Sequence, residues 1–402
     1  MKTKIAALGL GLLLAASNVW AADASSTGTF KIGILTDLTG TLSDLGGPGT
    51  GVAAKLAIDD VGGKVLGRPI ELLVVDHQNK ADIGIATARE WFERRGVVAL
   101  VDVMNSGIAL GVNDLTKQYG KLAFYSAAAT DRLSEDSCNG YGFSWNTDTY
   151  AQTNAIAQSQ IQQGQDSWYV IVPDYAYGHS MQAALESAVD RAGGKVVGAV
   201  RHPLGNLDFS SYILQAQGAG AKVLAIASGG KDLVNAVKQV REFGLTKRGM
   251  RVVLLLPYLS DVYALGLDQM QGLEFIDSWY WDMDEQSRAF SQRFFKEFNR
   301  MPTAVQASVY SSTLQYLKAV EAVGSYEPEK VRAYLLSIPI NDMFARNGKI
   351  LPNGRLIHDV YSVRIKTPEE SKGPWDLEEV TGTIPAEKAF RPLAESVCKI
   401  RN

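Results

Sequence analysis

The chain has 402 residues, a formal net charge of −3 and 46% apolar residues. Its length suggests two or three domains, and its composition is that of an ordinary globular protein. The sequence contains no basic tract or Lys/Arg-rich stripe, so we do not expect nucleic acid as a partner.

Residues 1–21 have the three-part pattern of a secretory signal peptide. Lys2 and Lys4 precede a short apolar run, which ends at the small-residue site Val19-Trp20-Ala21. A membrane anchor is the alternative, but the run is short for a span of about 20 residues. We therefore expect cleavage after Ala21 and a periplasmic location for the mature protein.

The mature chain alternates β-branched apolar runs with amphipathic stretches, a pattern typical of βαβ units around a parallel sheet. In the first half, strands are expected at 30–38, 69–77, 97–104 and 121–127, with helices at 49–61, 81–95 and 109–120. The same rhythm restarts with strands at 167–174, 194–203, 222–228 and 251–257, and helices at 153–163, 179–193, 209–220 and 232–244. This predicts an α/β fold with two Rossmann-like lobes.

A third section begins near residue 274. It predicts helices at 285–300, 304–324 and 328–338, followed by a hairpin-like pair over 347–366 with Asn353-Gly354 as its turn signal. Beyond Thr367 the periodicity is weak.

Two cysteines, Cys138 and Cys398, lie in polar, loop-like surroundings. Export permits a disulfide, and an even count is consistent with one. We predict a Cys138–Cys398 bond that pins the C-terminus to the end of the first domain. Two buried free thiols are the alternative.

No catalytic or metal-binding constellation is apparent. The four histidines are far apart and lack metal-ligand spacing, and no G-x-S-x-G elbow or phosphate loop follows a strand. Asp282, Asp284 and Glu285 are simplest to explain as a helix N-terminus, where carboxylates are favoured. We therefore expect binding rather than turnover, with no cofactor and no metal.

Small polar residues follow two expected strands. Ser126, Ala128 and Thr130 come after one strand, and Asn105-Ser106-Gly107 stands between another strand and a helix. In open α/β sheets, ligands bind at the carboxyl ends of strands beside helix N-termini. The hydroxyls and free amides of the two loops could hold one carboxylate between them.

The chain resembles the periplasmic solute-binding proteins of branched-chain-amino-acid-type ABC transporters, the type I or Leu/Ile/Val-binding class. The resemblance runs from about Phe30 to Arg364. It rests on "KIGILTDLTGTLSDLGGPGTGVAAKLAIDDVGG", "IELLVVDHQNKADIGIATA", "NSGIAL", "SAAATD" and "PDYAYGHSM". It implies two Rossmann-like lobes joined by a three-strand hinge, a ligand buried between them, and delivery to an inner-membrane permease by a monomeric protein.

The resemblance also implies domain limits and site residues. The first lobe would comprise 29–147 and 278–346, the second 148–277 and 347–366, and residues 367–402 a C-terminal extension. The loops that grip a carboxylate in the family match Ser106 with Gly107, and Ala128 with Thr130. The tyrosine that closes over the ligand matches Tyr177. Further family positions match Thr41 through Leu45, and Ser228 with Gly229.

One departure bears on the ligand. Amino-acid binders of this class place a glutamate near the ligand's ammonium, where this chain has Tyr258, with Asp261 three residues on. A buried ammonium without a carboxylate is costly, so a carboxylate without an amine is the first choice. Seven aromatic residues lie near strand ends and crossovers, and two or three are expected at the ligand: Trp145, Tyr150, Tyr177, Tyr258, Trp279, Tyr280 and Tyr310.

The sequence thus favours an aromatic or hydrophobic acid as the ligand. A branched-chain or other amino acid is second, and a urea-like or amide solute third. A sensor that presents its closed form to a membrane receptor would share the same fold. An exported enzyme is a weaker alternative, because the scattered histidines supply no catalytic set.

Overall fold

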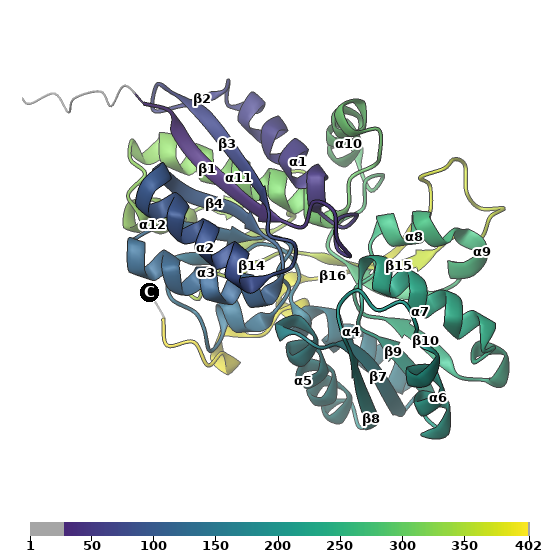
Figure 1. The fold of residues 1–402 in the computed structure, drawn as a ribbon. Coiled ribbons are helices and arrows are strands. Elements are labelled where there is room, and N and C mark those ends of the chain that lie inside the picture. The colour runs from purple at the N-terminus through teal and green to yellow at the C-terminus, as the bar shows by residue number, and fades with distance from the viewer. Residues whose placement is uncertain (1–27, 401–402) are drawn as a thin grey trace, which may run out of the picture.

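The computed structural model describes residues 28–400; the predicted signal peptide, residues 1–21, lies outside this range. Two lobes lie side by side, each built on a sheet with helices on both faces (Figure 1). Within the described residues, no helix is both long and apolar enough to cross a bilayer. The predicted α/β class with two Rossmann-like lobes is confirmed.

The first lobe contains a six-stranded sheet whose strands are parallel except for the short edge strand β2. Its strands lie in the order β2 (Lys64–Val65), β3 (Arg68–Asp76), β1 (Phe30–Thr36), β4 (Val97–Val103), β5 (Leu122–Tyr125), β6 (Gly142–Ser144). Ile32 and Ile34 of β1 join one apolar cluster and Leu35 joins another, so the sheet is covered on both faces. This explains the continuous apolar runs of these strands.

The first-lobe helices come from two separate segments of the chain, one before and one after the second lobe. They are α1 (Gly47–Asp60), α2 (Ala81–Glu90) with η1 (Trp91–Arg95), α3 (Ser106–Tyr119), η2 (Asp131–Ser134), α10 (Glu285–Phe298), α11 (Ala304–Val323) and α12 (Pro328–Ser337). Helix α1 packs against α10 and α11, and α2 packs against α3. Asp284 caps α10 by accepting from Ser287 N at 2.8 Å, as expected for an acidic helix start.

The second lobe is a four-stranded parallel sheet. Its strands lie in the order β10 (Arg251–Leu254), β9 (Val223–Ile226), β7 (Ser167–Pro173), β8 (Lys195–His202). Its helices are α4 (Thr149–Gln162), α5 (Ala176–Arg191), α6 (Ser210–Gly218), α7 (Gly230–Glu242), η3 (Thr246–Arg248), α8 (Leu259–Leu265) and α9 (Leu267–Met270). Val170 packs with α4 and α5, whereas Ile171 packs with α6 and α7.

Two small antiparallel sheets lie where the chain passes between the lobes. One contains β11 (Glu274–Asp277), β15 (Val360–Ile365) and β16 (Glu378–Ile384); the other contains β12 (Pro339–Ile340), β13 (Gly348–Ile350) and β14 (Leu356–Ile357). The predicted hairpin is confirmed as β13–β14, with Asn353-Gly354 at its turn. Strand β16 lies in the segment where sequence periodicity was weak.

Buried polar contacts fix the hinge. Arg355 forms an ion pair with Asp148 at 3.0 Å, and both side chains are about 95% buried. Arg355 also donates to the backbone carbonyl of Asn146, whose side chain accepts from Ser278 Oγ at 2.6 Å. These contacts join three crossing segments of chain at one point.

The segment after β16 returns to the first lobe. It includes α13 (Ala386–Ala389) and η4 (Leu393–Glu395). The predicted disulfide is confirmed, since Cys398 is bonded to Cys138 across 260 positions of sequence. We call residues 385–400 the C-terminal strap.

Candidate functional site

A small cavity lies between the lobes at the carboxyl ends of their strands. It receives residues from both lobes: Leu42, Leu45, Met104, Asn105, Ser106, Ala127, Ala129 and Val305 from the first, and Tyr175, Tyr177, Leu256 and Tyr258 from the second. Its free volume is about 20 Å³, room for about one water molecule. We call this space the interlobe cleft.

The lobes touch on two sides of the interlobe cleft. On one side the hydroxyls of Thr130 and Ser180 lie 2.7 Å apart. On the other, Lys231 N donates to the carbonyl of Thr41 at 3.1 Å. The structure is therefore a closed form, in which a ligand larger than water requires the lobes to separate or side chains to move.

Helix α3 points its N-terminus at the interlobe cleft. Asn105 caps this helix, and its side-chain oxygen accepts from Gly107 N at 3.0 Å and Ile108 N at 3.4 Å. Its φ of 71° and ψ of 114° are unusual for a residue other than glycine, a type of backbone strain that clusters at ligand sites. Ser106 begins the helix, and its Oγ accepts from Thr130 N at 3.3 Å.

Three tyrosines form the second-lobe side of the interlobe cleft. The rings of Tyr175 and Tyr177 lie 5.9 Å apart. The buried hydroxyl of Tyr177 has no hydrogen-bond partner in the part of the chain described. Burial raises the pKa of Tyr177 and of Tyr258 well above the ordinary value, so both phenols are neutral hydrogen-bonding groups.

The loop after β5 differs from the expected row of free amides. Ser126 N and Ala127 N donate to Oδ1 of Asp102 at 3.1 and 3.2 Å. Asp102 is fully buried, and its other carboxyl oxygen lacks a partner among residues 28–400. Burial raises the pKa of Asp102 to about 7. Sequence reasoning missed this residue, because an aspartate inside a strand gives no sign of which loop it will support.

Several predicted site residues converge on the interlobe cleft. Leu45, Ser106, Tyr177 and Tyr258 line it. Thr130 forms the interlobe hydrogen bond beside it, and Ala128 is buried between two lining residues of the same loop.

Three further predicted residues lie at the edge of the interlobe cleft: Gly107, Ser228 and Gly229. A side chain at Gly229 would meet Leu45 and Leu256, both lining residues. Gly107 follows Ser106, and a Cβ there would lie 4.0 Å from Ala176 of the second lobe. Ser228 Oγ is engaged by His202 Nε2 at 2.8 Å.

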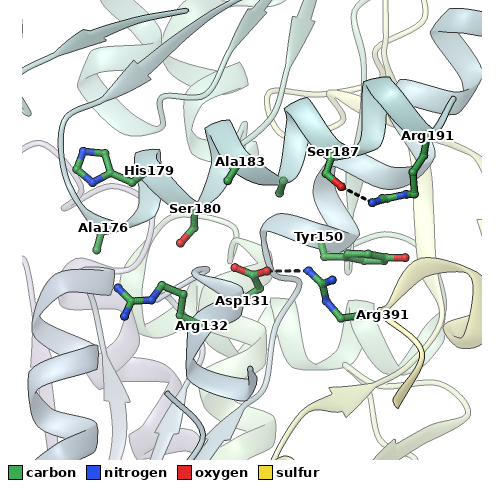
Figure 2. Close-up of a pocket in the computed structure, with 11 residues that line it drawn as sticks. Asp131, Arg132, Tyr150, Ala176, His179, Ser180, Ala183, Ser187, Arg191 and Arg391 are labelled. Atoms are coloured by element: carbon green, nitrogen blue, oxygen red, sulfur yellow. Dashed lines mark hydrogen bonds and ion pairs between the residues drawn. The ribbon is translucent and has the colours of Figure 1, made fainter. Parts of the chain in front are cut away.

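Two predicted residues lie elsewhere. Tyr310 donates its hydroxyl to Asp60 at 2.6 Å and packs against Phe290, so it supports the α1–α10–α11 packing. Tyr150 lines a second cavity of about 460 Å³, between α5 and η2 (Figure 2). There it lies between Arg191 and Arg391, 5.3 and 4.5 Å from its ring centroid.

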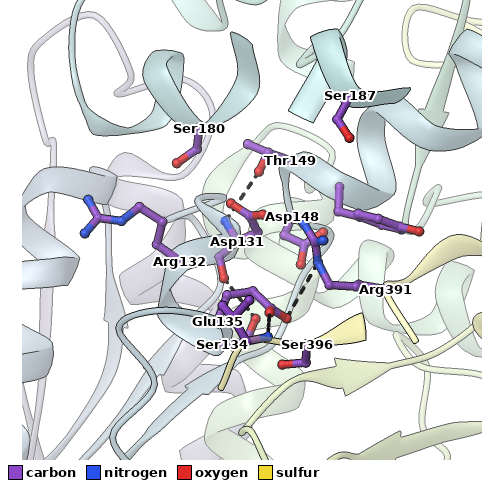
Figure 3. A network of polar contacts seen from close by, with 12 residues as sticks. Asp131, Arg132, Ser134, Glu135, Asp148, Thr149, Ser180, Ser187, Arg391 and Ser396 are labelled. Carbon is purple, nitrogen blue, oxygen red and sulfur yellow. Dashed lines mark hydrogen bonds and ion pairs between the residues drawn. The ribbon is translucent and has the colours of Figure 1, made fainter. Parts of the chain in front are cut away.

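A polar network connects this second cavity to the C-terminal strap (Figure 3). Arg391 pairs with Asp131 at 3.0 Å, and Glu135 accepts from Val397 N at 2.9 Å. Burial raises the pKa of the carboxyl groups of Asp131 and Glu135. Because Lys388 O also accepts from Asn154 of α4 at 3.4 Å, the strap contacts both lobes.

Comparison with known proteins agrees with this geometry. A sequence model of the periplasmic binding protein family matches residues 29–374, so the chain belongs to that family. The Leu/Ile/Val-binding protein homolog 6 of Brucella melitensis is 26% identical over 250 residues, which cover 61% of this chain and 63% of the relative. The chain therefore matches less than two thirds of the length of this relative.

Solved structures extend the similarity over most of the chain. A periplasmic binding protein of Burkholderia mallei has a TM-score of 0.90 and 43% identity, covering 92% of this chain and 99% of that one. A branched chain amino acid ABC transporter periplasmic ligand-binding protein of Burkholderia xenovorans has a TM-score of 0.83 and 45% identity, covering 92% and 100%. A solute binding protein of R. palustris in complex with benzoate shares the fold, with a TM-score of 0.81 and 17% identity, covering 93% and 100%. The type I periplasmic-binding-protein fold is thus confirmed.

Proposed function

We propose that this protein is the periplasmic substrate-binding component of an ABC importer. It captures a small carboxylate-bearing solute, with an aromatic or hydrophobic acid favoured, in the interlobe cleft and presents it to an inner-membrane permease. Its role is binding, without turnover, and the monomer is the delivering unit.

The observation that carries this proposal is the uncharged lining of the interlobe cleft. None of the side chains that line it is an acid or a base. The nearest acid along the second-lobe loop, Asp261, is 1% exposed, and its carboxyl accepts from Tyr258 N at 3.0 Å. An ammonium group in the cleft would therefore lack a counter-ion, which is costly in a buried site.

A carboxylate has better partners. The N-terminus of α3 presents the favourable end of its helix dipole to the cleft, and the hydroxyls of Ser106 and Tyr177 belong to residues that line it. Gly107 N and Ile108 N could bind the carboxylate only if they exchanged their present acceptor, the Asn105 side chain, for it. The remaining lining is apolar or aromatic, from residues such as Leu42, Met104 and Val305. Such a mixture suits a ring or aliphatic body with one anionic end. The benzoate complex of the R. palustris protein is consistent with this chemistry.

A branched-chain amino acid is the second candidate. It is favoured by the names of the Brucella and B. xenovorans relatives. In that case Asp261 would have to turn from Tyr258 N toward the ligand.

A thermal-shift panel tests the proposal. Mature protein is heated with benzoate, 4-hydroxybenzoate, cinnamate, phenylacetate, leucine, valine and benzamide, since binding to the folded state raises the melting temperature with ligand concentration. We expect the acids to raise it and leucine and valine to leave it unchanged. A shift with leucine alone would support the second candidate, and a shift with benzamide equal to that with benzoate would contradict a carboxylate site.

A further inference from the structure

Asp102 is a buried carboxyl group outside the hinge that supports the loop after β5. It lies on β4, fully buried, directly behind the loop whose Ala127 lines the interlobe cleft. Its Oδ1 accepts from Ser126 N and Ala127 N, whereas its Oδ2 has no partner among the described residues. An unpaired buried carboxyl oxygen is costly when the group is charged.

We infer that Asp102 is a positioning residue that couples capture of the carboxylate to uptake of a proton. In its neutral form it holds the Ser126–Ala127 turn beside the bound anion. In its charged form it places a second negative charge behind the same turn. This inference rests on the proposed function, since it requires an anionic ligand in the interlobe cleft.

Within residues 28–400, no cation contributes to the pKa of Asp102, which burial raises and the backbone N–H groups of Ser126, Ala127 and Val103 lower. Strand β4 packs against β1, β5, α11 and η1, and its apolar residues also cluster with those of α2 and α3. Asp102 is fully buried, whereas the charged side chains of these elements are exposed or partly exposed: Lys31, Asp82, Arg89, Glu90, Glu93, Arg94, Arg95, Asp114, Lys117, Lys318 and Glu321. Lys31, for example, is opposite Val97, whereas Asp102 is opposite Ile34, three positions further along β1.

The remaining titratable groups near this site are phenols, the buried His77 and further aspartates. Burial lowers the pKa of His77, so its ring is mostly neutral at pH 7. Tyr125 of β5 donates to Asn113 Oδ1 at 3.1 Å, and Tyr310 of α11 donates to Asp60. Tyr316, the other tyrosine of α11, is buried and neutral, its pKa raised by burial.

Asp37, just beyond β1, is already bonded to Gly40 N and Leu42 N. Across the cleft, the charge of Asp102 contributes to the raised pKa of Tyr258. Burial also raises the pKa of Asp261 and Asp277 to about 7, and both influence Tyr258 more than Asp102 does. Asp102 differs from them because it supports the first-lobe loop that carries Ala127 into the cleft.

The sign of the coupling follows from burial. The pKa of Asp102 lies near 7 rather than 3.8, so the carboxyl is mostly protonated at pH 6 and mostly ionised at pH 8.5. Two like charges repel, so the bound carboxylate raises this pKa further. Binding therefore takes up protons near pH 7.5, and affinity falls as the pH rises.

Isothermal titration calorimetry tests the inference with the acid of the panel that gives the largest thermal shift. For the wild type we expect affinity to fall about tenfold between pH 6 and 8.5. Titrations at pH 7.5 in buffers of different ionisation enthalpy should show net proton uptake. The near-isosteric Asp102→Asn variant should lose both effects while retaining affinity close to that of the wild type at pH 6.

One control variant and one fallback separate the outcomes. Glu378→Gln removes another buried carboxyl, away from the interlobe cleft, and should keep the pH dependence. If Asp102→Asn fails to fold, proton uptake that persists in both Asp261→Asn and Asp277→Asn assigns the proton to Asp102, and its loss in either variant overturns the inference. If an acid binds with an affinity that does not depend on pH and without proton uptake, the inference about Asp102 is wrong but the proposed function stands. Failure of every acid to bind between pH 5.5 and 8.5 overturns the proposed function as well.

Discussion

The hydroxyl of Thr130 in the first lobe lies 2.7 Å from the hydroxyl of Ser180 in the second. This hydrogen bond exists only when the lobes are closed, so it stabilises the closed form by about 0.5–1.5 kcal/mol. Both residues are buried, so few waters compete for the contact.

Ser180→Ala should therefore increase the ligand dissociation rate by roughly two- to tenfold. Stopped-flow fluorescence with a bound acid measures this rate. Ser187→Ala, on the same helix but facing Arg191, is the matched control and should leave the rate unchanged. Equal effects of the two variants would show that the Thr130–Ser180 bond does not hold the lobes together.

Gly230→Ala should prevent full closure. Gly230 has φ of 61°, and a Cβ there would lie 2.3 Å from the carbonyl oxygen of Thr41 in the other lobe. We expect at least tenfold weaker ligand binding and a larger radius of gyration in small-angle scattering.

Gly244→Ala provides the matched control for that variant. Gly244 has a similar φ of 66° in the same lobe, but a Cβ there would meet nothing within 4 Å. Both variants therefore carry similar backbone strain. Weaker binding in Gly244→Ala of the same size would attribute the effect to strain instead of the clash.

Removing the partner of a buried charge should weaken the hinge. Arg355→Met leaves Asp148 buried without its cation, and such changes cost about 3–5 kcal/mol. Urea denaturation followed by tryptophan fluorescence measures the loss. Arg364→Met, which breaks ion pairs of a partly exposed arginine with Glu370 and Glu379, should lower the midpoint far less, because exposed ion pairs are screened by solvent.

Loss of the disulfide should destabilise the protein by about 2–5 kcal/mol. The Cys138→Ser/Cys398→Ser double variant should unfold at lower urea concentration, and limited proteolysis should cleave its C-terminal strap first. Reducing agent should lower the midpoint of the wild type and leave that of the variant unchanged. Equal midpoints for the oxidised wild type and the variant would contradict a stabilising role.

Stability should fall as the pH rises from about 4 to 7. Burial raises the pKa of Asp102, Asp261 and Asp277 to about 7 in the folded protein, whereas unfolded aspartates titrate near 3.8. The folded state therefore holds extra protons in this range, and each is lost at a cost as the pH increases. His358, with its pKa lowered to about 4 by burial, opposes the trend.

Urea midpoints at pH 5 and pH 7.5 measure the balance between these groups. We expect the higher midpoint at pH 5, and Asp277→Asn should reduce the difference. A midpoint that rises with pH would mean that His358 and the paired carboxylates outweigh the three aspartates.

The sequence predicted the alternating strands and helices, the two lobes and the disulfide, because these depend on local periodicity and cysteine count. It also named Leu45, Ser106, Tyr177 and Tyr258, which meet in one cavity. Their roles in binding remain predictions.

Other features depend on tertiary contacts that no local pattern encodes. Tyr310 looked like a ligand-contacting aromatic residue, but it packs on Phe290 within its own lobe. Strand β16 consists mainly of charged and small residues and is largely exposed, so its sequence shows little strand periodicity. Its pairing with β15 is a tertiary contact that the sequence pattern did not indicate. Asp102 accepts hydrogen bonds from Ser126 N and Ala127 N. The sequence could not predict these bonds, because they depend on the loop after β5 lying beside β4 in the fold.

The disulfide gives the molecule a further property. Because it joins Cys138 to Cys398, almost all of the second lobe and the hinge belong to one covalent ring. A protease that cuts an exposed loop of this ring once produces a nick but releases no fragment, since the two pieces stay linked through sulfur. After such a cut, the ring topology keeps the two lobes together as a single molecule.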